Sequence, residues 1–248
     1  MIPYLQTRLP VLHEAEAVVV GGSLGGVAAA LALAKNGRRV ALIEPRTYLG
    51  REVTATLRSW LPESANPFAA PLWADLLPLF APEPSGGEYA LQLNRLKEWL
   101  EDRLLAAGVW LLYASRPVDL WWRNGRLAGV VVANKSGRQL VRGQLILDAS
   151  NGTAAWLAGG QRQAACSRQL AITLEFDRVN LPTGVPLPPP DRLAGLQGWR
   201  LHRGAHGPEH WLVECLLDAA GANRTAEYCA ARHLAMKTAV RLIDQHPA

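Results

Sequence analysis

The sequence has few cysteines, no clustered charge of one sign and no leader-like amino terminus. Three cysteines among 248 residues, with no CxxC pair, argue against a disulfide framework and favour a reducing compartment. The net charge is +5, but the basic residues form no long run, which is weak support for nucleic-acid binding. No basic segment followed by an apolar one opens the chain, so no secretory signal is expected. We therefore expect a cytoplasmic protein with no nucleic-acid partner.

The most informative stretch is residues 17–44, AVVVGGSLGGVAAALALAKNGRRVALIE. It begins with the apolar run Ala17–Val20, continues through a glycine-rich turn and then changes to small residues typical of a closely packed helix. Asn36-Gly37 stops this helix, and a second apolar run ends at Glu44. The order strand, glycine turn, helix, strand and acid is typical of a dinucleotide-binding βαβ unit.

Each part of this unit suits a nucleotide. Gly21 permits the tight turn, and Gly26 lets the helix pack close to the sheet. The free N–H groups at the helix start can face a pyrophosphate, and Glu44 can accept hydrogen bonds from ribose hydroxyls. Ser23 departs from the pattern because its Cβ crowds the diphosphate where a glycine is expected, although its hydroxyl can also bond to it.

Two other interpretations of the same stretch exist. Gly21-x-Ser23-x-Gly25 also matches the nucleophile elbow of serine hydrolases, which is likewise a strand–turn–helix. A nucleophile elbow normally follows several strands of its sheet, whereas few residues precede this one. Ala17–Ala34 carries no charge and contains small residues at the spacing of membrane helices, so a membrane helix is the other interpretation. Its glycines and β-branched start make it a poor uniform helix, and we expect no membrane span.

Periodicity and turn signals predict the other elements of the first part of the chain. Residues 45–56 are expected to form a loop around Gly50, and residues 60–88 an irregular excursion. After them we expect an amphipathic helix, a buried strand, a three-stranded antiparallel meander turning at Asn124-Gly125, and a buried parallel strand. Their expected ranges are Leu93–Ala107, Val109–Tyr113, Val118–Arg123, Leu127–Ala133, Gln139–Arg142 and Leu145–Asp148.

A change in composition after Gly160 predicts a second domain. Strands are expected at Leu170–Phe176 and Trp211–Leu217 around a Pro/Gly-rich middle at 181–208, and a helix at Arg224–Gln245. The predicted domains are 1–160 and 161–248. The predicted fold class is α/β, with a Rossmann-like domain (a parallel sheet with a three-stranded antiparallel meander) and a partial second α+β domain.

His202, His206 and His210 are the candidate general bases, and their spacing also suggests a metal site. Gly204, Gly207 and Pro208 interrupt any helix through them, so we expect exposed loop histidines and no metal. The cysteines are expected to be buried fillers without redox chemistry.

The order of elements resembles the FAD-dependent oxidoreductases of the glutathione-reductase-like flavoprotein superfamily. The resemblance rests on the glycine fingerprint at 21–26, LGREVTAT at 49–56, NKSGRQ at 134–139 and LILDAS at 145–150, and it extends from about Ala17 to Gln245. It implies FAD as the cofactor and hydride transfer from a small organic substrate to the flavin. It identifies no catalytic residue.

The resemblance also implies a set of cofactor contacts. The FAD pyrophosphate would lie on the glycine turn, the adenosine on the end of the second strand, and the ribityl chain or isoalloxazine beside the following loop. The implied residues are Gly21, Gly22, Ser23, Leu24, Gly25 and Gly26 for the pyrophosphate, Glu44, Pro45, Arg46, Pro117 and Val118 for the adenosine, Gly50, Arg51, Glu52 and Thr54 for the flavin side, and Ala149 and Ser150 beneath the diphosphate.

Two departures from the family affect the expected assembly. Asn151-Gly152-Thr153 lacks the aspartate that many relatives place there, and relatives continue beyond the last helix with a segment that returns to the flavin. We expect a heteromer in which a partner subunit supplies that part; a longer parent protein and an incomplete flavin site are the alternatives. A non-catalytic nucleotide-binding subunit and a hydrolase using Ser23 remain the competing functions.

Overall fold

The computed structural model describes residues 9–62, 76, 79, 88–150, 157–159, 169–179, 196–218 and 224–245. The chain divides into two compact units. The first unit consists of Met1–Glu52 and Lys97–Ala164, and the second of Val53–Leu96 and Ala165–Ala248. The predicted division into domains 1–160 and 161–248 stays a prediction.

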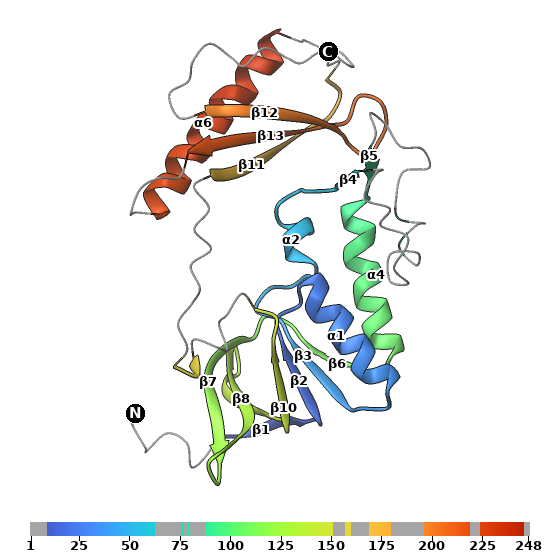
Figure 1. Cartoon of the computed structure of the whole chain (residues 1–248), viewed down its shortest axis with the longest axis vertical. Coiled ribbons are helices and arrows are strands. Elements are labelled where there is room, and N and C mark those ends of the chain that lie inside the picture. Colours follow the sequence, from blue (N-terminus) through green and yellow to red (C-terminus); the bar gives the residue numbers. More distant parts are fainter. Residues whose placement is uncertain are drawn as a thin grey trace. The chain divides into compact units, whose positions relative to one another are not determined.

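The first unit is built on a four-stranded parallel sheet with the order β10-β2-β3-β6 (Figure 1). The strands are β2 (Ala17–Val20), β3 (Val40–Ile43), β6 (Trp110–Leu112) and β10 (Leu145–Asp148). Helix α1 (Leu24–Lys35) connects β2 to β3, and Gly37 leaves it with a φ of +74°. The predicted βαβ unit is therefore confirmed, with β3 as the parallel neighbour of β2.

A second sheet packs against one face of the parallel sheet. It contains the predicted meander, β7 (Arg116–Arg123), β8 (Arg126–Asn134) and β9 (Gly137–Arg142). Asn124 and Gly125 both have positive φ, at 52° and 74°, as a type I′ hairpin turn requires. The unpredicted strand β1 (Val11–Glu14) pairs in parallel with β9. Alternate side chains of β2 and β3 meet apolar meander residues, namely Val18, Val20, Ala41 and Ile43 on one side and Leu120, Val130, Val132 and Val141 on the other.

Helices α2 and α4 follow β3 along the chain. The short helix α2 (Arg51–Thr54) occupies part of the segment that was predicted as a loop. Helix α4 (Leu93–Ala106) confirms the predicted amphipathic helix, because Leu96, Leu100 and Leu104 on its apolar stripe are fully buried or nearly so. Gly108 ends the turn after it with a φ of +71°.

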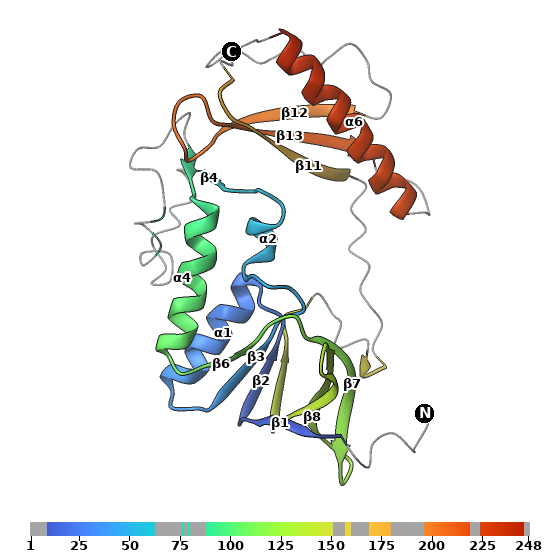
Figure 2. The same cartoon turned by 180° about the vertical axis from the view of Figure 1, so that it is seen from behind.

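The second unit contains a three-stranded antiparallel sheet with the order β11-β13-β12. The strands are β11 (Gln169–Phe176), β12 (Leu196–Arg203) and β13 (Trp211–Asp218), and α6 (Arg224–Gln245) covers one face of the sheet (Figure 2). The predicted strands and helix are confirmed. β12 was missed because it lies inside the range read as Pro/Gly-rich.

A further antiparallel pair, β4 (Trp60–Pro62) with β5 (Glu88–Ala90), belongs to the second unit. The two strands lie at the two ends of residues 60–88, for which the sequence predicts only irregular structure. Most of that range lies outside the described residues. The fold class is otherwise as predicted: α/β, with a parallel sheet, an antiparallel meander and a second α+β part.

The cysteines only partly match their expected role. Cys215 is buried, and burial raises the pKa of its thiol to about 11, which fits an inert filler. Cys229 is exposed on α6, so the expectation was wrong for that residue, and Cys166 lies outside the described residues. None of the described helices combines the length and apolar character needed to cross a membrane.

Candidate functional site

The candidate site lies at the carboxyl edge of the parallel sheet, where β2 turns into α1. Gly21 has a φ of +105°, and a Cβ there would lie 2.5 Å from the Ala149 carbonyl oxygen. A Cβ on Gly26 would lie 2.1 Å from the Gly21 carbonyl oxygen and 3.0 Å from the Ala149 Cβ. The turn, the first residues of α1 and the end of β10 are therefore packed so closely that only glycine fits at these two positions.

The start of α1 offers unused hydrogen-bond donors. Ser23 is the N-cap residue, and its hydroxyl accepts from the Gly26 N–H at 3.0 Å. The Leu24 N–H donates to the Glu52 carboxylate. Among the described residues, no acceptor faces the N–H groups of Ser23 and Gly25, and a Cβ on Gly25 would meet only the Ser23 Oγ, at 3.8 Å. An anion can therefore approach this helix end along the Gly25 side.

Glu44 follows β3 directly and is 1% exposed. Its Oε2 accepts from the Gly22 N–H at 2.7 Å, and its Oε1 accepts from the Arg46 N–H at 2.9 Å. The Arg46 guanidinium lies 3.4 Å from the same Oε1. The carboxylate therefore ties the tip of β3 to the glycine turn. Oε1 accepts from both Arg46 donors, whereas Oε2 keeps a lone pair for a further donor.

The loop after Glu44 returns to the glycine turn. Gly50 has a φ of +65°, and its N–H donates to the Gly22 carbonyl at 2.8 Å. Arg51 and Glu52 open α2 in the first unit, where the Glu52 side chain reaches Leu24. Thr54 is buried and belongs to the second unit. No local sequence signal indicates the contact between Glu52 and Leu24, because 28 positions separate the two residues along the chain.

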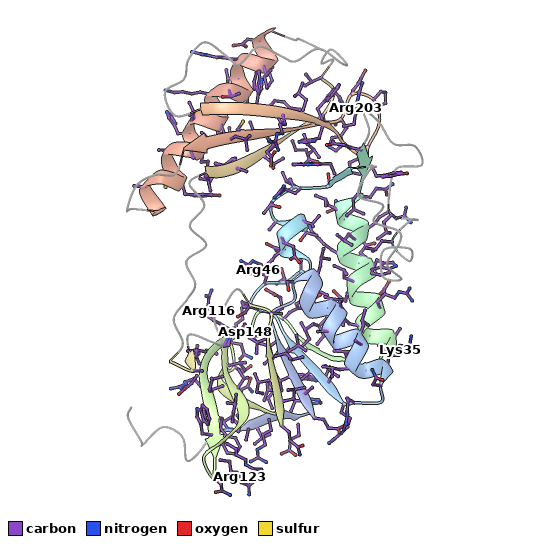
Figure 3. The ribbon with its side chains drawn as sticks, in the orientation of Figure 1. Lys35, Arg46, Arg116, Arg123, Asp148 and Arg203 are labelled. Atoms are coloured by element: carbon purple, nitrogen blue, oxygen red, sulfur yellow. The ribbon has the colours of Figure 1, made fainter. Side chains whose placement is uncertain are left out.

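The remaining predicted residues come from β10 and β7. The Ala149 N–H donates to the Val20 carbonyl at 2.8 Å, and the Ser150 N–H donates to Asp148 Oδ1 at 2.9 Å. Arg46, Arg116 and Asp148 lie at the same end of the parallel sheet (Figure 3). Pro117 and Val118 follow Arg116 on β7, and Pro117 pairs with Val132 of the meander. Within the described part of the chain, no hydrogen bond or ion pair joins these two residues to the glycine turn, whereas residues 21–26, 44–46, 50–52 and 149–150 are brought together.

The geometry of Ser23 does not favour the hydrolase interpretation. Its φ of −65° and ψ of 165° are those of relaxed extended backbone, whereas a nucleophile elbow is strained. The hydroxyl is engaged as a helix cap, and no described histidine contact involves it. Ser23 is therefore a capping residue of α1.

This role of Ser23 predicts a graded result. Ser23→Ala is expected to lower the free energy of unfolding by about 1 kcal/mol, and Ser23→Gly by only a few tenths, because glycine is tolerated at an N-cap. Chemical denaturation measures both values. Fluorophosphonate labelling of the wild type but not of Ser23→Ala would contradict the assignment and restore the hydrolase.

The histidines differ from their predicted exposure. His202 and His210 are each 5% exposed, and only His206 lies at the surface. His202 lies on β12, and His210 directly precedes β13, where strand pairing buries them. Among the described residues, no three His, Cys, Asp or Glu side chains are grouped to hold a metal ion.

Comparison with solved structures places the fold among flavoproteins. A geranylgeranyl bacteriochlorophyll reductase-like protein from Thermoplasma acidophilum aligns with TM-score 0.62 and 18% identity over 95% of this chain and 62% of its own. A myxobacterial FAD-dependent chondrochloren halogenase aligns with TM-score 0.57 and 19% identity over 95% of this chain and 58% of its own. A p-nitrophenol 4-monooxygenase from Pseudomonas putida aligns with TM-score 0.59 and 15% identity over 87% of this chain and 61% of its own. The chain thus spans about three-fifths of the length of these structures. No curated protein matches the chain.

The sequence itself matches one family. The model of the FAD dependent oxidoreductase family matches residues 16–173, which is more than half of the chain. The matched range contains the glycine turn, Glu44, the loop to Glu52 and the end of β10. The chain therefore belongs to the FAD-dependent oxidoreductase family, whose cofactor is FAD.

Proposed function

We propose that this chain holds FAD at the glycine turn of the first unit and forms the FAD-binding part of an oxidoreductase that acts on a small organic substrate. The observation that carries the proposal is a pair of N–H groups at the start of α1, those of Ser23 and Gly25, that have no acceptor among the described residues. They lie beside a buried acid that follows the adjacent parallel strand. This is the arrangement that binds a diphosphate and a ribose. We also propose that the family belongs to the glutathione-reductase-like flavoprotein superfamily.

The residues around the turn fit the cofactor. Gly21 and Gly26 leave no room for side chains, and Gly25 leaves open space for a diphosphate. Glu44 Oε2 keeps a lone pair for a ribose hydroxyl. Arg46 and the backbone of Pro117-Val118 would line the adenine end. The other proposed contacts are Gly22, Ser23 and Leu24 at the diphosphate, Pro45 beside the ribose, Gly50, Arg51, Glu52 and Thr54 towards the flavin, and Ala149 and Ser150 below the diphosphate.

FAD, when bound, accepts a hydride from a substrate C–H bond; the protein supplies orientation and electrostatics. The Leu24 N–H donates to Glu52 at the helix end where the diphosphate is expected. The Glu52 carboxylate therefore has to move aside or share this donor when the cofactor enters.

The test is the cofactor content of the purified chain. We expect visible flavin absorbance after expression or after incubation with FAD, and release of FAD on denaturation, identified by mass spectrometry. A chain that binds neither FAD nor FMN under these conditions would overturn the proposal. A chain that binds FAD but is reduced by no donor would instead support a non-catalytic nucleotide-binding subunit.

A partner subunit is the second part of the proposal. The chain covers 62% and 58% of two structural neighbours, which is compatible with a heteromer in which another chain completes the flavin site. Native mass spectrometry of the complex isolated from its source would show the partner. A monomer with full FAD occupancy would contradict the proposed partner subunit but not the proposed FAD binding.

A further inference from the structure

In the second unit, α6 covers one face of the sheet, and the opposite face carries charged and polar side chains. Val213, Cys215 and Leu217 of β13 pack with α6, so the alternation of a strand turns Glu214 to the opposite face. The strand register places Arg200 opposite Glu214 and His202 opposite Leu212. Arg200, His202 and Glu214 therefore share the face that α6 leaves uncovered.

Glu214 is an acid between apolar residues of β13, and it is 2% exposed. Its Oε1 lies 3.8 Å from Arg58 Nε, and its Oε2 lies 3.6 Å from an Arg200 guanidinium nitrogen. The two arginine side chains remain 56% and 66% exposed. One buried carboxylate thus holds two guanidinium groups, and the exposed parts of both keep further donors accessible.

His202 is fixed on two sides. Its Nδ1 lies 2.7 Å from Glu88 Oε2, and its ring stacks on Trp60 with 3.7 Å between centroids and 7° between planes. Its Nε2 is buried and has no hydrogen-bond partner among the described residues. In the tautomer whose Nδ1–H donates to the Glu88 carboxylate, Nε2 carries a lone pair and is an acceptor. A buried acceptor without a donor is costly and calls for a partner.

His210 provides an internal comparison. Its Nε2 lies 2.9 Å from Glu175, and its Nδ1 accepts from the His206 N–H at 3.2 Å. Both ring nitrogens are thus satisfied within the protein, as expected of a structural histidine. His202 has a glutamate on one ring nitrogen but lacks a partner for the other among the described residues.

We propose that this polar face binds a small carboxylate that carries a hydroxyl or amino group, with the carboxylate on Arg58 and Arg200 and the O–H or N–H donating to His202 Nε2. Arg200 and His202 are two residues apart on β12, roughly 7 Å along the strand, so one small molecule can reach both. Planar guanidinium groups match a carboxylate in two-point hydrogen bonding. Identifying this ligand as the substrate rests on the proposed function; the binding site itself does not.

Binding of matched acids to the full FAD-loaded chain tests the inference. The probes are lactate against propionate and mandelate against phenylacetate, each pair differing by one hydroxyl, with alanine as the amino probe. Calorimetry or ligand-observed NMR is expected to show that the hydroxyl improves affinity at least ten-fold in one of the pairs. His202→Gln should remove that difference, and Arg200→Gln should weaken both members of a pair about ten-fold.

His206→Gln is the matched control and should leave every affinity unchanged, because His206 is exposed and four residues away. Melting temperatures of all variants exclude misfolding as the cause. Equal binding of both members of each pair, no binding of any probe, or an unchanged preference in a folded His202→Gln would overturn the inference. Because the readout is binding, such failure is distinguishable from a chain that lacks flavin.

Discussion

Gly26→Ala is expected to yield a chain that retains no FAD and unfolds more easily. The added Cβ would lie 2.1 Å from the Gly21 carbonyl oxygen, which is backbone and cannot rotate away. Helix α1 must then move off β2, and overpacking of this kind typically lowers the free energy of unfolding by about 1–3 kcal/mol. The same movement displaces the amide groups that are proposed to hold the diphosphate. Flavin absorbance per chain and chemical denaturation measure the two effects.

Gly25→Ala, one residue earlier, separates cofactor binding from stability. Its Cβ would meet only the Ser23 Oγ at 3.8 Å, and alanine favours a helix by up to about 1 kcal/mol over glycine. The variant should therefore be as stable as the wild type or slightly more stable. Its FAD affinity should fall at least ten-fold, because the methyl group occupies the space proposed for the diphosphate. A stable Gly25→Ala chain with wild-type affinity would show that the diphosphate lies elsewhere.

Glu44→Gln is expected to weaken FAD binding ten- to a hundred-fold and to destabilise the first unit by about 2 kcal/mol. The carboxylate accepts from two backbone N–H groups, those of Gly22 and Arg46. A glutamine has only one acceptor oxygen, so its amide group would face one of these donors and leave it unsatisfied. Hydrogen bonds to a charged group contribute about 1.5–3 kcal/mol each, which sets the expected magnitude. A titration with FAD and a denaturation curve measure the two losses.

Glu16→Gln is a suitable control for this substitution. Glu16 also accepts from a backbone N–H, that of Arg39 at 3.0 Å, and pairs with Arg38, but it is partly exposed and precedes β2. An exposed pair of this kind contributes little to stability, so the control should bind FAD normally. If Glu44→Gln behaved like Glu16→Gln, the ribose would have to be held by another group.

The glycine turn has two linked functions in this structure. Its glycines let α1, β2 and the end of β10 approach closely, and the same packing aims the helix-start amides at one point. Glu44 then fastens the turn to the neighbouring strand. With FAD at the proposed site, we therefore expect substitutions of Gly26 and Glu44 to change both cofactor affinity and local stability, and substitution of Gly25 to change affinity alone.

Local sequence signals predicted the elements that depend on neighbouring residues. The βαβ unit lies within residues 17–44, and its turn, helix and stop are set by residues that contact one another along the chain. The hairpin at Asn124-Gly125 needs positive φ at both positions, which these two residues adopt at low cost. The helix at Leu93–Ala106 follows from a repeat of leucines every three or four residues.

Other features were decided by partners far away in the chain. β1 was missed because it is a short edge strand whose partner is β9, and Glu14 pairs with Arg142 across 128 positions. β12 lies in a range dominated by prolines and glycines and is specified by its register with β13. The short helix α2 and the Glu52 contact with α1 likewise depend on how the loop after Glu44 folds back.

The sequence by itself determined the nucleotide-binding unit, the fold class and the residues at the glycine turn, because backbone dihedral angles and helical or strand periodicity are set by near neighbours. Only the tertiary structure decided that Ser23 caps a helix, that His202 is buried with an unused nitrogen, and that Glu214 lies between two arginines. Burial and hydrogen-bond partners depend on which distant segments pack together, and no local pattern encodes that choice.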